Sequence, residues 1–293
     1  MRFIAQGAVI SVTNSGKIGG MARLLNGSEL AGYIQERQAR QVRALRQASH
    51  VYPKLVIIKS RGASPVIDTY VRMKRRYGDE IQIETEILTL SEDEMPAEIA
   101  RLNDDRAVHG MIIQLPLDDK SRTDEIVNLV APEKDVDGLG KDATFDSATA
   151  LAINWLLAGY AVDLKGKKLT IVGKGRLVGA PLAKLWEKSG YDVTVLDRSR
   201  DDMNDVLRAS DVIVTATGVP RLITSMVVPV GATVVDAGTA SEDGMIVGDV
   251  DPALRERDDI KITPEKGGVG PLTIVALFDN VIQAAQVVAN QEN

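Results

Sequence analysis

A tyrosine and a lysine one helical turn apart are the first residues in this chain that could do chemistry. Tyr70 and Lys74 lie in a segment with a helical pattern, so their side chains share one face. A lysine buried beside an aromatic ring can have its pKa lowered enough to transfer protons. The alternative is a solvated helix face, because Lys74 lies among Arg72, Arg75 and Arg76. Spacing alone leaves both interpretations open.

Polar side chains also follow the apolar segments of the first half. Gln114 ends the apolar stretch 110–114 and comes shortly before a chain-reversing proline. Asp135 and Asp137 flank one apolar residue, so in extended backbone their side chains point in opposite directions. One acid can face a site while the other braces the loop. A metal site on this pair is the weaker alternative, because two carboxylates supply too few ligands; we expect no metal.

The second half contains a glycine-rich turn. Gly173, Gly175 and Gly179 follow the apolar run 169–172 and lead into a helical segment. Glycines at such a turn let a pyrophosphate lie against the helix N-terminus, although the third glycine is one place later than usual. Asp197 ends the next apolar run, where an acid can accept from a ribose 2′-hydroxyl. A solvated loop acid is the alternative.

Two further loops contain glycine. Thr217 and Gly218 follow the run 212–215, where small residues let a planar cofactor lie across a sheet edge, or simply form a turn. The segment 267–271 contains three glycines and a proline, which oppose regular strand or helix. We expect it to be a binding loop, with Thr273 capping the apolar helix that follows.

The elements that must position these residues alternate between strand and helix. The expected helices are 30–48, 65–77, 94–103 and 149–158, and the expected strands are 54–59, 81–88, 110–114, 169–172, 192–196, 212–215 and 233–236. This alternation predicts parallel sheets covered by helices on both faces. A length of 293 residues predicts two domains.

Composition excludes several classes of function. A net charge of −6 argues against a protein built chiefly to bind nucleic acid. The absence of Cys rules out disulfides, Cys-ligated zinc and thiol nucleophiles, and suits a reducing compartment. No apolar run approaches the ~20 residues that cross a bilayer, so no membrane association is expected. Residues 1–28 are basic until Glu29, which fits either a targeting peptide or an extra N-terminal strand or extension.

Taken in order, these segments resemble the bifunctional methylenetetrahydrofolate dehydrogenase/cyclohydrolase family. The resemblance runs from about Leu25 to the C-terminus and is carried by 70–74, 110–117, 132–138, 178–181, 248–251 and 267–273. The lysine-aspartate-valine-aspartate-glycine segment 134–138 and the double-glycine-valine-glycine-proline segment 267–271 are together highly specific.

The resemblance implies a two-domain α/β enzyme. An α/β folate-binding domain would comprise 1–145 plus 268–293, and a Rossmann-like doubly wound parallel sheet would comprise 146–267, with the C-terminal helix returning to the first domain. The implied reactions are hydride transfer from 5,10-methylenetetrahydrofolate to a nicotinamide cofactor, then hydrolysis of the methenyl product to 10-formyltetrahydrofolate. The resemblance also implies a cytoplasmic homodimer that acts in one-carbon metabolism and purine biosynthesis.

The resemblance also implies residue roles. Lys74 would transfer the proton, Gln114 would hydrogen-bond Lys74 and help keep it neutral, Tyr70 would pack on the aminobenzoyl ring, and Asp137 would bind the pterin edge. The other implied substrate-binding residues are Leu115, Pro116, Gly270 and Pro271. The implied cofactor-binding residues are Thr149, Gly173, Lys174, Gly175, Arg176, Val178, Gly179, Asp197, Arg198, Thr217, Gly218 and Gly238.

The chain departs from the family pattern at three places. Ile67 replaces a serine, the segment 147–152 keeps only Thr149 of a proline-cysteine-threonine-proline-x-glycine motif, and 173–175 replaces glycine-arginine-serine. The last change and the charge of Asp197 favour NAD over NADP, whereas Arg198 and Arg200 could pair with a 2′-phosphate. The alternatives are a monofunctional enzyme, a degenerate folate- or cofactor-binding module, and a shikimate-type dehydrogenase, which also pairs a lysine with an aspartate.

Overall fold

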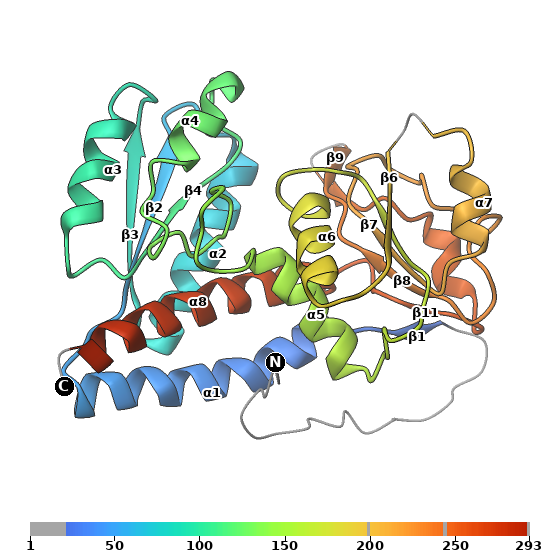
Figure 1. Ribbon diagram of the computed structural model, residues 1–293, viewed down its shortest axis with the longest axis horizontal. Coiled ribbons are helices and arrows are strands. Elements are labelled where there is room, and N and C mark those ends of the chain that lie inside the picture. Colours follow the sequence, from blue (N-terminus) through green and yellow to red (C-terminus); the bar gives the residue numbers. More distant parts are fainter. Residues whose placement is uncertain (1–21, 198–199, 243–244, 292–293) are drawn as a thin grey trace. The chain divides into compact units, whose positions relative to one another are not determined.

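The computed structural model describes residues 22–197, 200–242 and 245–291, and the chain divides into two compact units (Figure 1). Of the described residues, the six-strand unit contains those in the ranges 22–30 and 150–272. The three-strand unit contains 31–149 and 273–291. Each unit is built around a parallel sheet of its own, which confirms the expected fold class.

The sheet of the three-strand unit has the order β3-β2-β4 and is parallel throughout. Its strands are β2 (Lys54–Ser60), β3 (Glu84–Leu90) and β4 (Gly110–Ile113). Side chains alternate between the two faces of the central strand β2, and the four apolar side chains from Leu55 to Ile58 are all fully buried. A strand buried on both faces needs a continuous apolar run, which explains why this segment was visible in the sequence.

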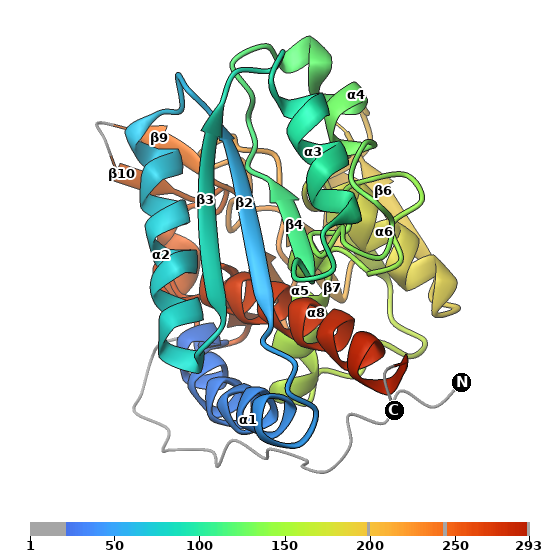
Figure 2. The same ribbon diagram turned by 90° about the vertical axis from the view of Figure 1, so that its left-hand side faces the viewer.

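Helices cover both faces of this sheet. The helices are α1 (Gly27–Ala48), α2 (Pro65–Ile81), α3 (Met95–Asp104), α4 (Thr123–Val127) and α8 (Val269–Gln291), with a 3-10 turn at Lys120–Arg122. Figure 2 shows α3 in front of the sheet, where its apolar side chains share one core with Val56 and Ile58. Residues of α8 lie against the other face, because a Cβ on Gly110 would come within 3.1 Å of Val281.

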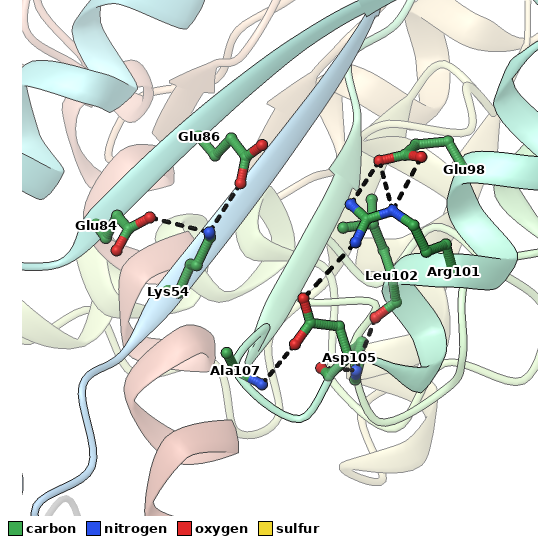
Figure 3. A network of polar contacts seen from close by, with 9 residues as sticks. Lys54, Glu84, Glu86, Glu98, Arg101, Leu102, Asp105 and Ala107 are labelled. Atoms are coloured by element: carbon green, nitrogen blue, oxygen red, sulfur yellow. Dashed lines mark hydrogen bonds and ion pairs between the residues drawn. The ribbon is translucent and has the colours of Figure 1, made fainter.

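Ion pairs support the surface of this sheet. Figure 3 shows the Lys54 amine of β2 between Glu84 and Glu86 of β3, at 2.9 and 2.8 Å. In the same view Arg101 pairs with Glu98 on α3 at 2.6 Å. Exposed pairs of this kind contribute about 0–1 kcal/mol each, so burial of the apolar strands carries most of the stability.

The six-strand unit has the strand order β1-β11-β8-β7-β5-β6, and all neighbouring strands are parallel. Its strands are β1 (Arg23–Leu24), β5 (Leu169–Val172), β6 (Val193–Leu196), β7 (Val212–Thr215), β8 (Thr233–Asp236) and β11 (Lys261–Ile262). The chain passes from β5 outward to β6 and then back across to β7, so the strand order reverses between β5 and β7. Doubly wound sheets bind ligands beyond the carboxyl ends of the strands at this switch point.

The remaining elements of this unit connect and cover the strands. They are α5 (Ala148–Gly159), α6 (Gly179–Lys188), α7 (Met203–Arg208), a 3-10 turn at Pro252–Glu256, and the antiparallel hairpin of β9 (Ala240–Glu242) and β10 (Met245–Val247). The short β11, β9 and β10 were absent from the expected elements, because two or three residues carry no measurable periodicity, whereas β1 falls within the range 1–28, where an extra N-terminal strand was one alternative.

The N-terminal end of the described chain falls in a different unit from the expected range 1–145. Arg23 of β1 is in register with Lys261 of β11, and the Leu25 amide donates to the Ile262 carbonyl at 2.8 Å. These contacts join β1 to the six-strand unit, which contains residues 22–30 and also residues 268–272. The targeting-peptide alternative concerned residues 1–28, of which residues 1–21 lie outside the described residues.

The start of α8 corrects the expectation for the segment 267–271. The helix begins at Val269, so Gly270 and Pro271 belong to its first turn and Thr273 lies inside it rather than capping it. A proline is tolerated there because amides of the first turn have no helical partner. Only Gly267, with φ of +82°, and Gly268 retain the irregular backbone that the sequence suggested.

The apolar character of α8 also corrects a second expectation. By length and composition this helix is apolar enough to cross a membrane, contrary to the expectation that no segment is. However, 67% of its most apolar stretch is buried inside the protein. Helices that are apolar on most sides and buried are typical of protein cores.

Candidate active site and cofactor loops

The Lys74 amine is hydrogen-bonded to a neutral amide. Lys74 Nζ donates to Gln114 Oε1 at 2.8 Å. Gln114 directly follows β4, and its backbone amide extends the ladder to the Ile58 carbonyl at 2.8 Å. Gln114 Nε2 donates to the Leu115 carbonyl at 3.1 Å, just before the cis peptide to Pro116. The amide is therefore oriented with its oxygen toward the lysine.

The environment of Lys74 favours its neutral form. Desolvation lowers the pKa of the Lys74 amine, and the negative charge of Asp137 opposes this shift. Desolvation likewise raises the pKa of the Asp137 carboxyl, opposed by Lys74. Because Gln114 carries no charge, it orients the lysine without holding the proton as a carboxylate would. The arrangement suits a group that gives up and regains a proton.

The two acids of 135–137 divide their roles as one of the alternatives anticipated. Asp135 is buried and accepts from the backbone amides of Gly138 and Gly140, at 3.0 and 2.7 Å. It therefore braces a loop that turns at Gly138, whose φ is +67°. Asp137 instead interacts electrostatically with Lys74.

We call Tyr70, Lys74, Gln114 and Asp137 the lysine site. Tyr70 lies one turn before Lys74 on α2, and burial raises the pKa of its hydroxyl. Leu115 is half-buried and Pro116 is exposed directly after Gln114. The structure thus brings together Lys74, Gln114 and Asp137, which are separated by 40 and 23 positions in the sequence.

Two departures from the family pattern have local structural explanations. Ile67, which replaces a serine, is a buried residue of α2 at 6% exposure, so it contributes to the core. The segment 147–152 still begins a helix, because α5 starts at Ala148. Thr149 lies in the first turn of α5 and groups with the three-strand unit, whereas Gly270 and Pro271 group with the six-strand unit.

The glycine loop, residues 173–179, follows the carboxyl end of β5. Gly173 has φ of +108°, and a Cβ on Gly179 would lie 1.9 Å from the Gly173 carbonyl oxygen. The loop therefore folds back on itself more tightly than any side chain would allow. A Cβ on Gly175 would instead meet nothing within 4 Å, so this backbone faces open space near the start of α6. That is the arrangement that receives a dinucleotide phosphate.

Charged residues flank the glycine loop. Lys174 Nζ pairs with Asp197 Oδ2 at 2.7 Å, which joins the loops after β5 and β6. Arg200 pairs with Asp202 at 2.6 Å within its own loop. Arg176 and Val178 are half-buried in the glycine loop. Arg198, an expected cofactor residue, lies outside the described residues.

The loops after β7 and β8 continue the same sheet edge. Thr217 and Gly218 follow β7, and Gly238 follows β8. A Cβ on Gly173 would lie 2.5 Å from the Ala216 carbonyl oxygen, so the loops after β5 and β7 are in contact. The expected cofactor residues of this unit that the structure describes therefore gather along the carboxyl edge around the switch point.

A buried acid that we did not single out holds this edge. Asp249 is fully buried and accepts from Thr215 Oγ1 at 2.7 Å and from the Thr217 amide at 2.6 Å. In the sequence it appeared only within the family segment 248–251, with no role assigned. That motif was the one signal available for it.

Two family models match most of the chain. The model of the tetrahydrofolate dehydrogenase/cyclohydrolase catalytic domain matches residues 25–137. The model of the NAD(P)-binding domain of tetrahydrofolate dehydrogenase/cyclohydrolase matches residues 147–289. The chain belongs to the tetrahydrofolate dehydrogenase/cyclohydrolase family. The lysine site lies within the residues matched by the first model. The glycine loop and the loops after β6, β7 and β8 lie within those matched by the second.

Individual members of this family are similar to the chain over nearly its whole length. The bifunctional protein FolD of Anoxybacillus flavithermus is 35% identical over 285 residues, covering 90% of this chain and 98% of that protein. The crystal structure of the bifunctional FolD methylenetetrahydrofolate dehydrogenase/cyclohydrolase of Campylobacter jejuni has a TM-score of 0.85 at 33% identity, covering 91% and 99%. The Trypanosoma brucei enzyme, solved with NADP and an inhibitor, also has a TM-score of 0.85, at 28% identity and 92% and 98% coverage.

Proposed function

We propose that this protein oxidises 5,10-methylenetetrahydrofolate to 5,10-methenyltetrahydrofolate with a nicotinamide cofactor and hydrolyses the product to 10-formyltetrahydrofolate. The observation that carries the proposal is the bond between Lys74 and the neutral Gln114, beside Asp137, within a matched catalytic domain. The matched NAD(P)-binding domain supports the oxidative half of the reaction.

The lysine site suits both reactions. Loss of hydride makes the folate carbon cationic, so a permanently charged neighbour would oppose the step, whereas a lysine with a lowered pKa can be neutral. A bound nicotinamide cofactor supplies the hydride acceptor. The neutral Lys74 amine can then take a proton from the water that attacks the methenyl carbon.

The remaining residues of the lysine site are proposed to hold the folate. Asp137, whose carboxyl lies near Lys74, accepts hydrogen bonds from the edge of the pterin. Tyr70, on the same face of α2, packs on the aminobenzoyl ring. Leu115, Pro116, Gly270 and Pro271 complete the binding residues carried over from the family. Thr149 and the residues of the glycine loop and neighbouring loops bind the cofactor.

Side-by-side turnover assays test this function. Absorbance would follow methylenetetrahydrofolate with NAD and with NADP, and methenyltetrahydrofolate would be assayed separately without cofactor. We expect both activities. One activity alone would indicate a monofunctional enzyme, and tight folate binding without turnover would indicate a binding module. A shikimate-type dehydrogenase would bind no folate.

We further propose NAD as the preferred cofactor. Asp197 directly follows β6, where its carboxylate can accept from the ribose 2′-hydroxyl and would repel a 2′-phosphate. Arg200 already pairs with Asp202 and is therefore a weaker candidate for that phosphate. Lys174 argues against this preference. Its amine lies 2.7 Å from the Asp197 carboxylate and offsets the negative charge that would repel a 2′-phosphate.

The substitution Asp197→Asn tests this preference. Removing the charge while keeping the shape should shift the ratio of kcat/KM for NAD over NADP toward NADP by roughly tenfold, about the effect of one charge-assisted hydrogen bond. Steady-state kinetics with both cofactors would measure the ratio. Asp205→Asn, which alters an exposed acid on α7, is the matched control. An unchanged ratio in Asp197→Asn would contradict the proposed role.

The pH dependence of hydrolysis tests the role of Gln114. The neutral fraction of Lys74 grows as the pH rises through its lowered pKa, so the rate should rise with it. The substitution Gln114→Glu would place a carboxylate 2.8 Å from the amine, stabilise the ammonium form and raise the pKa of Lys74. We expect the rising limb of the pH–rate profile to move to higher pH. Gln47→Glu, at an exposed position on α1, should leave the profile in place, and an unmoved profile in Gln114→Glu would count against the proposal.

We also propose a cytoplasmic homodimer that binds neither nucleic acid nor membranes. The six-strand unit exposes the apolar side chains of Met226, Val230 and Met245, at 79%, 80% and 65%. Contiguous apolar surface of this kind would be a candidate partner surface, and the homodimer itself is carried over from the family. The mass in solution, measured by light scattering, tests the dimer, and a monomeric mass at micromolar concentration would exclude it.

A further inference from the structure

Asp249 gathers the donors of one loop around a single buried carboxylate. Its Oδ2 accepts from Thr215 Oγ1 at 2.7 Å, from the Thr217 amide at 2.6 Å and from Thr217 Oγ1 at 2.9 Å. Its Oδ1 accepts from the Val219 amide at 3.0 Å. All four donors lie in residues 215–219, which we call the threonine loop. It begins at Thr215, the last residue of β7, at the switch point of the sheet.

A second carboxylate fixes Asp249 itself. The Asp249 amide donates to Asp236 Oδ1 at 3.0 Å, and the Val250 amide donates to Asp236 Oδ2 at 3.1 Å. Asp236 ends β8 and is held in turn by Arg255 at 3.4 Å. The Asp249 carboxylate is thus anchored to the sheet before it contacts the threonine loop.

Glycine leaves the room that this arrangement needs. A Cβ on Gly238 would lie 2.1 Å from Asp249 Oδ1, and a Cβ on Gly248 would lie 2.0 Å from Asp236 Oδ2. Any side chain at either position would displace a buried carboxylate from its donors. Residues 248–250 and Gly238 therefore form one interlocked support beneath the threonine loop.

We propose that Asp249 is a positioning residue for the dehydrogenase reaction. Its carboxylate holds the threonine loop in the conformation that receives the nicotinamide cofactor, and it acts through Thr217 and Gly218. Buried carboxylates are costly unless every oxygen is satisfied, so four donors from one irregular loop indicate that the loop must keep a defined shape. The inference rests on the proposed function for the identity of the ligand.

The substitution Asp249→Asn tests the proposal. An amide presents only one accepting oxygen, so either the Thr217 amide or the Val219 amide loses its bond to residue 249, although the Val219 amide also donates to Thr217 Oγ1 at 3.1 Å. We expect the dissociation constant of NAD, measured by fluorescence titration of NADH and by competition, to rise tenfold or more. Hydrolysis of methenyltetrahydrofolate without cofactor should keep the wild-type rate, because the lysine site is unchanged.

The neighbouring acid of the same segment is the matched control. Asp251 accepts from the Ala253 amide at 2.9 Å and caps the 3-10 turn Pro252–Glu256. Asp251→Asn makes the same chemical change in the same segment without touching the threonine loop. Cofactor affinity in Asp251→Asn should match that of the wild type.

A second pair of variants covers the case in which Asp249→Asn does not fold. Thr215 is fully buried, and Thr215→Val keeps its shape but removes one donor to Asp249. Thr215→Val should weaken cofactor binding severalfold, whereas Thr215→Ser, which keeps the hydroxyl, should retain most of the wild-type affinity.

The proposal would be overturned if Thr215→Val, and Asp249→Asn where it folds, bound NADH like the wild type. It would also be overturned if hydrolysis fell in parallel with cofactor affinity. A wild-type protein that binds NADH but turns over no folate would refute the proposed function and leave the positioning role intact.

Discussion

Replacing Lys74 by methionine is expected to abolish both oxidation of methylenetetrahydrofolate and hydrolysis of methenyltetrahydrofolate. Positioned proton transfer contributes about 10²–10⁴-fold to such reactions, and methionine retains the length of the lysine stem without an amine. Gln114 would keep its bond to the Leu115 carbonyl but lose the one group it orients. Initial rates of both reactions, measured on the same preparation, should fall by about two to four orders of magnitude.

The same variant should remain folded. Desolvation lowers the pKa of Lys74 below its ordinary value of 10.5. Because the folded state binds this proton more weakly than the unfolded state does, the shift costs stability at low pH, and that cost is lost as the pH rises from the lowered pKa toward 10.5. Lys74→Met removes this desolvation cost and also the opposing attraction to Asp137, so its melting temperature should stay close to that of the wild type.

A surface lysine provides the comparison for this experiment. Lys120→Met changes an exposed residue of the same unit and should leave both rates and the melting temperature unaltered. If Lys74→Met folded normally and retained either activity within twofold, Lys74 could not be the proton-transfer group for that reaction. Loss of activity accompanied by unfolding would instead indicate a structural role.

Alanine at two glycines of the glycine loop should have separable effects. In Gly179→Ala the new Cβ would lie 1.9 Å from the Gly173 carbonyl oxygen, a backbone atom that no rotamer change can move. We expect the six-strand unit to lose roughly 1–3 kcal/mol or more of stability, which is typical of overpacking. In Gly175→Ala the Cβ meets nothing in the protein, so stability should be unchanged.

Gly175→Ala, which should leave stability unchanged, is the variant expected to weaken cofactor binding. The open backbone at Gly175 is where a phosphate can approach closely, so a methyl group there should weaken NAD binding about tenfold or more in a fully folded protein. Thermal melts and NADH titrations on both variants separate the two effects. Gly32→Ala, at an open position of α1, is the control. It should leave cofactor affinity unchanged and should not reduce stability, because alanine favours helix. Wild-type affinity in Gly175→Ala would show that the ligand does not contact this backbone.

The sequence determined the strands that are buried on both faces and the family to which the chain belongs. The runs that became β2, β5, β7 and β8 were visible because a strand covered on both sides is apolar at every position. Lys74, Gln114 and Asp137 were predicted as a group because their motifs occur in the family order, and the structure brings these three residues together.

Tertiary structure alone decided how those residues are held. The division of roles between Asp135 and Asp137 depended on which backbone amides the loop presents, and the start of α8 depended on a first turn that tolerates proline. Asp249 and Thr215 are 34 positions apart, and nothing in either local segment indicates that they share a hydrogen bond. Periodicity and motifs report on neighbours along the chain, whereas a buried carboxylate is satisfied by donors that only folding brings to it.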